Sequence, residues 1–187
     1  MSLLLTKASK LRVFDGFNRA NGLPGIADTG QAWEAFTGGY EIENGQLKLK
    51  TAVVGAMTAI NSGEADCRFS AFICALGVAT ARTIRPRVSA SGKDRLLLYI
   101  ATPSTLTLAK TINEVVTVLA TVPSGVSSEQ SHELFAVLRG AEVSVGVNGV
   151  ELITTTINDV ELINNTRHGI SASAIDAAFD ILRVEVL

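Results

Sequence analysis

The sequence predicts an all-β protein, built as a two-sheet antiparallel β-sandwich. Apolar residues alternate with a period of two along most of the chain, and the helical period of 3.6 is nearly absent. Short runs of this kind are separated by turn residues about every 8–12 positions, which is typical of a sandwich. A parallel β-α-β arrangement would need helical segments of about ten residues or more. The best helical candidate, Ser124–His132, is short and Ser-rich, so we expect a loop there.

Composition indicates one domain over residues 1–187, with residues 1–10 as a candidate assembly arm. The chain has 187 residues, 47% hydrophobic and 18% charged, with a net charge of −2. At roughly 150 residues per domain this is one unit, and it hides about 70% of its surface on folding. A sequence pI near 5.7 argues against a nucleic-acid partner.

The most strongly determined element is a hairpin over Gly39–Lys50. Asn44-Gly45 can adopt positive φ at both central positions of a type I′ turn, which matches the twist of paired strands. The resulting register places Ile42 opposite Leu47 on one face.

A second hairpin follows the same logic over Glu142–Leu152. Here Asn148-Gly149 forms the turn, and the odd positions from Val143 face the core. The predicted pairs are Val147 with Val150 and Val145 with Leu152.

The remaining strands are shorter or less regular. They are predicted at Leu11–Phe14, Val53–Ile60, Cys67–Leu76, Thr83–Val88, Arg95–Ala101, Thr105–Leu108, Val115–Val122, Glu133–Leu138, Gly169–Ser173 and Phe179–Val186. The segment Arg95–Ala101 is apolar on both parities, as expected of a central strand covered on both sides. The parity break between Ile181 and Leu182 predicts a bulge in the last strand.

Cysteine usage and the apolar segments bear on the compartment. Cys67 and Cys74 lie seven residues apart, roughly 23 Å along a strand and beyond the reach of a disulfide, so we expect two free thiols. Synthesis in a reducing cytoplasm fits this pattern. The first residues do not resemble a signal peptide, and no run reaches the ~18 apolar residues of a membrane span.

The irregular region after the first strand carries a family resemblance. Phe14–Gly25 follows the pattern D-x-F-x-R-A-[DN]-G, and Thr29–Trp33 reads T-G-x-x-W. Together with the V-x-V-N-G hairpin at Val145–Gly149, the strand start at His168 and the Phe179-Asp180-Ile181 run, this resembles concanavalin A-like jelly-roll modules. Such modules are common in structural proteins of tailed bacteriophages and in bacterial surface and carbohydrate-binding proteins. The resemblance implies a jelly roll over the whole chain.

The opening motif has a structural interpretation that requires no ligand. Phe17 and Trp33 are large apolar anchors that would hold the loop on the sandwich edge. Asp15 and Arg19 are placed to form an ion pair.

No catalytic, metal or cofactor residue is assigned. Catalytic members of the superfamily carry an E-x-D-x-x-E strand, and the nearest segment here has Glu64 and Asp66 but Phe69 in place of the third acid. His132 and His168 have no neighbours at metal-ligand spacing. Asn158-Asp159 and Asp176 could contribute oxygen ligands to a Ca²⁺ site, but no loop concentrates enough acids for the six or more ligands that Ca²⁺ requires. Tyr99 is the best free aromatic for a sugar, but its strand is apolar on both faces, so no sugar site is assigned.

Two features favour assembly. The basic run Arg82–Arg87 places Arg85 and Arg87 on one face by alternation, either as a solvated strand face or as a contact for an acidic partner. Leu3, Leu4 and Leu5 would each forfeit roughly 1.5–3 kcal/mol if left in water, which predicts contact with another chain.

We therefore expect a non-enzymatic bacteriophage virion structural protein. In this interpretation it decorates the capsid or associates with the tail or fibre, as a homo-oligomer, preferably a trimer, with other virion proteins as partners. It would be located in the virion after synthesis in the host cytoplasm. The alternatives are a carbohydrate-binding module for attachment to a host surface, with a glycan as partner, and a glycosidase of the same superfamily. Neither a nucleic acid nor a membrane is expected as a partner.

Overall fold

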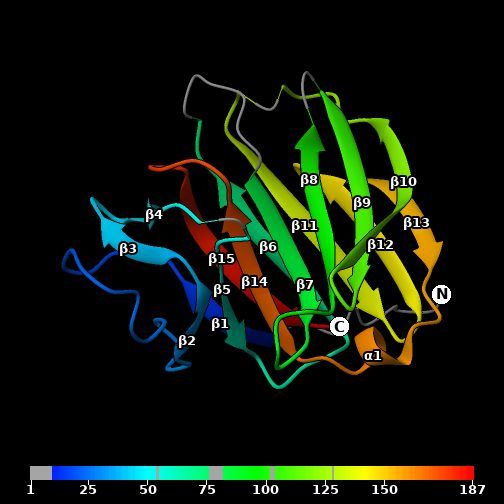
Figure 1. Cartoon of the computed structure of the whole chain (residues 1–187), viewed down its shortest axis with the longest axis horizontal. Helices are drawn as coiled ribbons and strands as arrows, with labels where there is room; N and C mark the ends of the chain where they lie inside the picture. Colours follow the sequence, from blue (N-terminus) through cyan, green and yellow to red (C-terminus); the bar gives the residue numbers. More distant parts are fainter. Residues whose placement is uncertain (1–9, 54, 76–81, 102–103, 128) are drawn as a thin grey trace, which may run out of the picture.

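The computed structural model describes residues 10–53, 55–75, 82–101, 104–127 and 129–187, and this part of the chain forms two antiparallel sheets (Figure 1). The predicted all-β sandwich is confirmed. Leu3, Leu4 and Leu5, expected to make assembly contacts, lie outside the described residues, as does the candidate arm up to residue 9.

The eight-stranded sheet has the order β13-β12-β11-β6-β15-β4-β3, and β1 also pairs with β15. Its strands are β1 (Lys10–Asp15), β3 (Gly39–Glu43), β4 (Gln46–Thr51), β6 (Cys67–Ile73), β11 (His132–Arg139), β12 (Glu142–Val147), β13 (Val150–Thr156) and β15 (Ala178–Val186).

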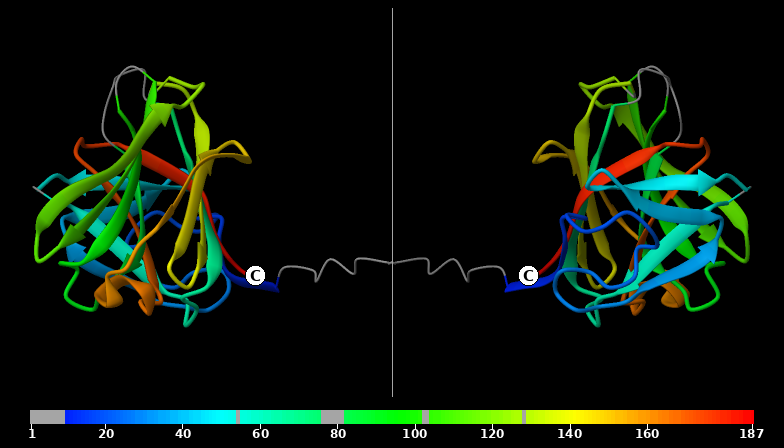
Figure 2. Two further views of the ribbon diagram at one scale, coloured as in Figure 1. Left: turned by 90° about the vertical axis from the view of Figure 1, so that its right-hand side faces the viewer. Right: turned by 90° about the vertical axis from the view of Figure 1, so that its left-hand side faces the viewer.

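The seven-stranded sheet has the order β10-β9-β8-β7-β14-β5-β2. Its strands are β2 (Trp33–Thr37), β5 (Met57–Asn61), β7 (Arg82–Val88), β8 (Arg95–Ala101), β9 (Thr105–Ile112), β10 (Val115–Pro123) and β14 (Arg167–Ala172). A short helix, α1 (Val160–Ile163), leads into β14. The views along the sandwich show the two layers, with green β8 and β9 in one and yellow β12 in the other (Figure 2).

The core lies between the two sheets, where side chains of alternate residues meet. Phe69 and Phe179 from one sheet and Leu98 and Ile170 from the other are fully buried and belong to one hydrophobic cluster. Full burial of each such side chain contributes about 1.5–3 kcal/mol. The same alternation leaves the second face of each sheet directed outward, and the outer face of the seven-stranded sheet holds the candidate site.

The first hairpin is confirmed and the second is confirmed in part. Ile42 pairs with Leu47, and Asn44 and Gly45 both have positive φ (54° and 72°). In the second hairpin Val147 pairs with Val150 as predicted. Val145, however, pairs with Ile153 rather than Leu152, because the register shifts between Val145 and Gly146.

Several local features differ from the sequence prediction. Strands β5 and β6 are shorter than expected, and β2 and α1 were not predicted at all. The bulge in the last strand is confirmed by a register shift between Asp180 and Leu182. Cys67 and Cys74 are free and buried, as predicted. No helix in the described ranges is long and apolar enough to cross a membrane.

Strand β8 corrects one expectation that bears on function. It is central, lying between β7 and β9, but only one of its faces is covered. Leu96 and Leu98 are fully buried on the inner face, whereas Leu97 and Tyr99 on the outer face are half-buried. Its apolar character on both parities therefore marks a partly open apolar surface and not a second covering layer.

Candidate functional site

The outer face of the seven-stranded sheet contains two adjoining pockets. The larger has a volume of about 450 Å³ and is bordered by β7, β14 and the connection between β4 and β5; it is lined by Ala52, Val53, Gly55, Thr83, Arg85, Ser171, Ala172 and Ser173. We call it the Arg85 pocket. The second, of about 320 Å³, is lined by Phe36, Thr37, Gly55, Met57, Ser91, Gly92, Lys93, Arg95 and Glu114. Gly55 lines both, so the two form one continuous candidate surface.

The strand register explains how distant residues meet at the Arg85 pocket. Ser171 on β14 pairs with Thr83 on β7, and Thr83 pairs in turn with Tyr99 on β8. Directly opposed residues of antiparallel strands share a face of the sheet, with Cβ atoms about 4.5–5.5 Å apart. The two hydroxyls and the half-buried Tyr99 ring therefore form a row across three adjacent strands.

Arg85 is the most unusual residue of this face. Its side chain is only 8% exposed, and its Nε donates a hydrogen bond of 2.5 Å to Ser171 Oγ. Its Nη1 is buried and has no hydrogen-bond acceptor among the described residues. Buried polar groups in folded proteins are nearly always hydrogen-bonded, so this open donor requires an explanation.

The charge of Arg85 is also uncompensated. Burial lowers the pKa of its guanidinium to about 9, and the nearby positive charge of Arg95 lowers it further, while Tyr40 acts weakly in the opposite direction. The residues outside the described ranges contain no Asp or Glu, so every carboxylate of the chain lies in the described part. Arg85 makes no ion pair within that part.

Arg87 has a different environment, which corrects the predicted common face of Arg85 and Arg87. The β7–β14 register shifts between Arg167 and Gly169, and this inserts an extra residue in β7. Arg87 has a positive φ of 53°, is fully buried and donates to the carbonyl oxygens of Ala65 and Gly140 and to Asp66. Alternation fails because the bulge reverses the side-chain direction. Neither arginine forms a solvated strand face.

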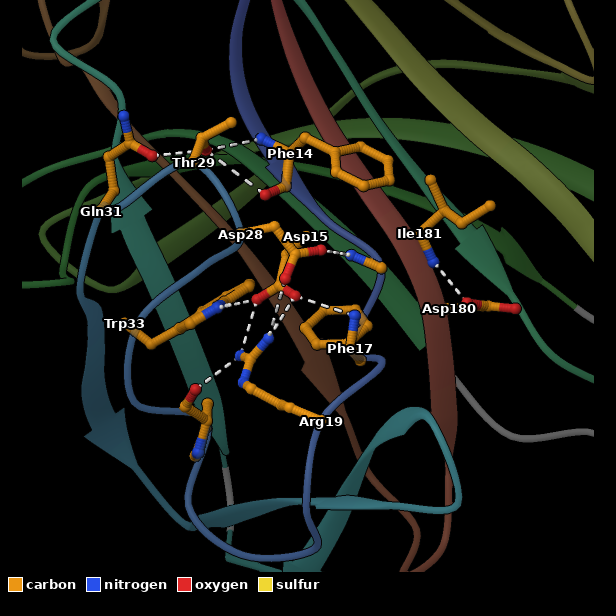
Figure 3. A network of polar contacts seen from close by, with 12 residues as sticks. Phe14, Asp15, Phe17, Arg19, Asp28, Thr29, Gln31, Trp33, Asp180 and Ile181 are labelled. Carbon is orange, nitrogen blue, oxygen red and sulfur yellow. Dashed lines mark hydrogen bonds and ion pairs between the residues drawn. The ribbon is translucent and has the colours of Figure 1, made fainter.

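The opening motif forms a closed polar cluster around Asp15 (Figure 3). Asp15 is fully buried and accepts two hydrogen bonds from Arg19, of 2.6 and 2.8 Å. Trp33 Nε1 and the Phe17 amide each donate to Asp15 at 2.8 Å. Arg19 also donates to the Pro24 carbonyl, and the hydrogen bonds that it donates to Asp15 raise the pKa of the Arg19 guanidinium.

This Asp15 cluster holds the loop and offers little chemistry. Phe17 is fully buried, and its ring lies 5.8 Å from that of Trp33, centroid to centroid. All four motif residues named from the sequence are thus brought together at one place. A smaller pocket of about 280 Å³ lies beside them, lined in part by Trp33, Pro24 and Tyr40.

The two acids nearest to a glycosidase pattern are occupied elsewhere. Glu64 forms an ion pair with Arg12 at 3.3 Å, and Asp66 accepts from the Gly140 amide at 2.8 Å and from Arg87. Neither lines the Arg85 pocket or its neighbour. The only carboxylate that lines either of these two pockets is Glu114.

Both histidines are structural in the described part of the chain. His168 is fully buried; its Nε2 donates to the Glu64 carbonyl at 2.9 Å, and its Nδ1 accepts from the Arg87 amide at 3.4 Å. Burial lowers its pKa to about 4. His132 is buried and contacts the Gln130 carbonyl. Within the described ranges no group of three or more His, Cys, Asp or Glu side chains is arranged to hold a metal ion.

Sequence reasoning missed the hydroxyls of Thr83 and Ser171 as site residues and did not assign Tyr99. The available signal was the strand Arg95–Ala101. Its outward-facing residues Leu97 and Tyr99 are apolar or aromatic, although the described part of the chain forms only two layers and places no sheet over them. The partnership of Arg85 with Ser171 has no sequence signal, because 86 positions separate the two residues.

Comparison with known proteins identifies the fold. No family model and no curated protein matches the chain. Among solved structures, the β-glucanase of Bacillus licheniformis superposes with a TM-score of 0.65 and 10% identity, covering 97% of this chain and 100% of that chain. The carbohydrate-binding module CBM66 of Bacillus subtilis gives 0.63 and 14%, covering 81% and 92%. The galectin LEC-6 of Caenorhabditis elegans gives 0.54 and 11%, covering 73% and 94%. The chain therefore has the concanavalin A-like jelly-roll fold.

These comparisons contradict the predicted virion structural role. The matched proteins are a glucanase, a carbohydrate-binding module and a galectin, and nothing links the chain to a bacteriophage particle. The expected capsid, tail and oligomer contacts receive no support. The concanavalin A-like part of the resemblance holds.

Proposed function

We propose that this protein is a carbohydrate-binding module that binds a glycan without cleaving it, on the outer face of the seven-stranded sheet. One observation carries the proposal: the Arg85 pocket is lined by the hydroxyl residues Thr83 and Ser171, which are largely buried, and adjoins the half-buried Tyr99, with no carboxylate in its lining. The likeness to a carbohydrate-binding module supports it.

The residues of this face suit a sugar. The Tyr99 ring supplies an apolar surface with a polar tip, which is the kind of side chain that interfaces use when one side stays wet. Thr83 and Ser171 each carry a hydroxyl that can both donate and accept a hydrogen bond. A pocket of about 450 Å³ lies within the usual ~300–1,000 Å³ range of small-molecule sites.

The linings of the two pockets do not present the pair of carboxyl groups that glycosidases use. Glycosidases generally flank the scissile bond with two carboxyl groups, about 5–9.5 Å apart according to mechanism. The Arg85 pocket has none, and the adjoining pocket has only Glu114. Glu64 and Asp66 are engaged in other contacts. Binding without turnover is the function that this arrangement supports.

The test combines a glycan panel with an assay for new reducing ends. We expect the wild-type protein to bind at least one oligosaccharide class and to release no reducing ends from it. Tyr99→Ala should weaken binding about 2- to 10-fold, because an aromatic contact contributes about 0.5–1.5 kcal/mol. Phe72→Ala is the matched control, since Phe72 is an exposed aromatic on the other sheet.

Three results would contradict the proposal. Binding to no member of a broad panel would remove the function itself. Release of reducing ends that is lost in Glu114→Gln would show a glycosidase. Loss of binding in Phe72→Ala, with Tyr99→Ala unaffected, would place the glycan on the eight-stranded sheet.

A further inference from the structure

We propose that the Arg85 pocket recognises an oxyanion carried by the glycan, either the carboxylate of a uronic acid or a sulfate ester, so that the preferred ligand is an acidic sugar. This inference rests on the proposed carbohydrate-binding function and adds the chemical class of the ligand. It assigns to Arg85 the role of binding the anion directly.

The first argument is the open hydrogen-bonding capacity of a deeply buried cation. Arg85 is only 8% exposed, and Ser171 Oγ is the acceptor of its Nε. Its Nη1 has no acceptor within the described part of the chain, although the residue lines a pocket large enough for a ligand. A guanidinium presents its N–H groups as a planar fork that matches the two oxygens of a carboxylate or sulfate. A ligand oxyanion in the pocket would supply the acceptor that the described part of the chain does not provide.

The second argument is the local charge, which favours an anion over a neutral sugar. The two adjoining pockets are lined by three cations, Arg85, Lys93 and Arg95, and by one carboxylate, Glu114. The chain as a whole carries a net charge of −2, so this positive surface runs against the overall balance. A buried charge is costly unless it is paired, and a neutral hydroxyl would leave the charge of Arg85 uncompensated.

The third argument is the set of neutral donors around the guanidinium. Thr83, Ser171 and Ser173 line the same pocket, and each hydroxyl can donate to an oxyanion. No carboxylate lines the Arg85 pocket to repel the ligand. The lining thus offers hydrogen-bond donors and positive charge together, which is the arrangement that an anionic group requires.

The test compares oligosaccharides of equal length that differ only in charge. Isothermal titration calorimetry would use an oligogalacturonate, a sulfated oligogalactoside and the neutral oligogalactoside, so the two acidic ligands separate carboxylate from sulfate. The proteins are wild type, Arg85→Gln, Arg85→Lys and the control Arg139→Gln; Arg139 is a well-exposed arginine in a surface ion pair. Circular dichroism and thermal unfolding check that each variant is folded.

We expect wild type to bind one acidic ligand about 10- to 100-fold more tightly than the neutral one, the range expected for hydrogen bonds to a charged group. Arg85→Gln should abolish this preference, Arg85→Lys should retain part of it, and Arg139→Gln should preserve it. Should Arg85→Gln fail to fold, Arg85→Lys tests the anion site instead, because it keeps the positive charge and loses the planar pair of guanidinium donors.

The outcomes separate this inference from the proposed function. Equal binding of acidic and neutral ligands by wild type, or an acidic preference unchanged in the Arg85 variants, overturns the anion site and leaves carbohydrate binding intact. Failure of all three ligands, together with failure of the wider panel, overturns the proposed function and this inference with it. Binding of an acidic polypeptide but of no glycan would assign the pocket to a protein partner and would also overturn the inference.

Discussion

Asp15 and Arg85 are both buried ionisable residues, yet their surroundings are opposite. Asp15 is fully buried and receives four hydrogen bonds, two from Arg19 and one each from Trp33 and the Phe17 amide. Arg85 is nearly as buried, but it has one hydroxyl acceptor, an open Nη1 and no carboxylate partner.

The difference teaches how to separate scaffold from site in this fold. A buried charge whose hydrogen bonds are complete within the chain stabilises local structure, and its removal leaves other groups unpaired. A buried charge with an unpaired donor is costly to the fold, and a ligand that pairs it would remove that cost. Arg87 belongs with Asp15 in this respect, because its guanidinium is bonded to the Ala65 and Gly140 carbonyls and to Asp66.

The largest effect is expected at the closed cluster. Asp15→Ala should lower the free energy of unfolding by about 3–5 kcal/mol, because it leaves the Arg19 guanidinium without its buried partner. Urea denaturation measures this loss. Asp28→Asn is the matched control; Asp28 is partly exposed and lies 3.8 Å from Arg19, so its change should stay below about 1 kcal/mol. Equal losses in the two variants would contradict the account of the cluster.

The next effect concerns pH. Burial holds the folded-state pKa of His168 at about 4, below its ordinary value of 6.5, so the unfolded chain binds the proton more readily. Stability is therefore lost as the pH falls from 6.5 towards 4, by on the order of 3 kcal/mol in total. The free energy of unfolding should fall less steeply with decreasing pH across this window in His168→Gln than in wild type. Identical slopes would show that His168 does not contribute.

Arg85 and Arg87, two of the three arginines of β7, allow a direct comparison of unpaired and paired charge. Arg87→Met should cost about 2–3 kcal/mol, because two carbonyls and Asp66 lose their donor. Arg85→Met should be neutral or stabilising in the ligand-free protein, because it removes an uncompensated buried charge. Chemical denaturation of both variants decides the matter; a larger loss for Arg85→Met would mean that Arg85 serves the scaffold.

A smaller effect is expected at the Asn44-Gly45 turn, whose geometry is determined by the turn residues themselves. Gly45→Val should lower stability by roughly 1–3 kcal/mol, since a β-branched residue is strained at the positive φ of 72° found there. Thermal unfolding measures the loss. The control is Gly16→Ala, at a glycine without positive φ, where a smaller change is expected. A Gly45→Val protein as stable as wild type would show that the turn tolerates a different geometry.

The features that could be predicted from the sequence are those determined by residues close together in the chain. The Gly39–Lys50 hairpin was predicted in its correct register because a two-residue turn and alternation leave one solution. The failures are bulges and long-range partners. One extra residue in β7 reverses Arg87, and the register shift after Val145 changes its partner to Ile153. Tertiary packing alone determines such shifts.

The candidate site was harder to predict for the same reason. Arg85 was singled out as basic, but its burial and its bond to Ser171 depend on β14, which lies far away in sequence. Tyr99 was noticed and not assigned, because an apolar outer parity was taken as a sign of a covering layer. Because the seven-stranded sheet has one covered face in the described part of the chain, apolar residues on the other face of β8 indicate a candidate binding surface.

Mapping a bound acidic oligosaccharide by NMR tests whether the ligand occupies the Arg85 pocket. The amide signals are first assigned, and an oligogalacturonate or its sulfated counterpart is then titrated into the protein. The signals of Thr83, Tyr99 and Ser171 should shift. Those of Phe17 and Arg19 should not, because the ligand binds at Arg85 and not at the Asp15 cluster. Shifts centred on the pocket beside Trp33 and Pro24 would contradict the account, as would shifts at Thr83 and Ser171 that persist unchanged in Arg85→Gln.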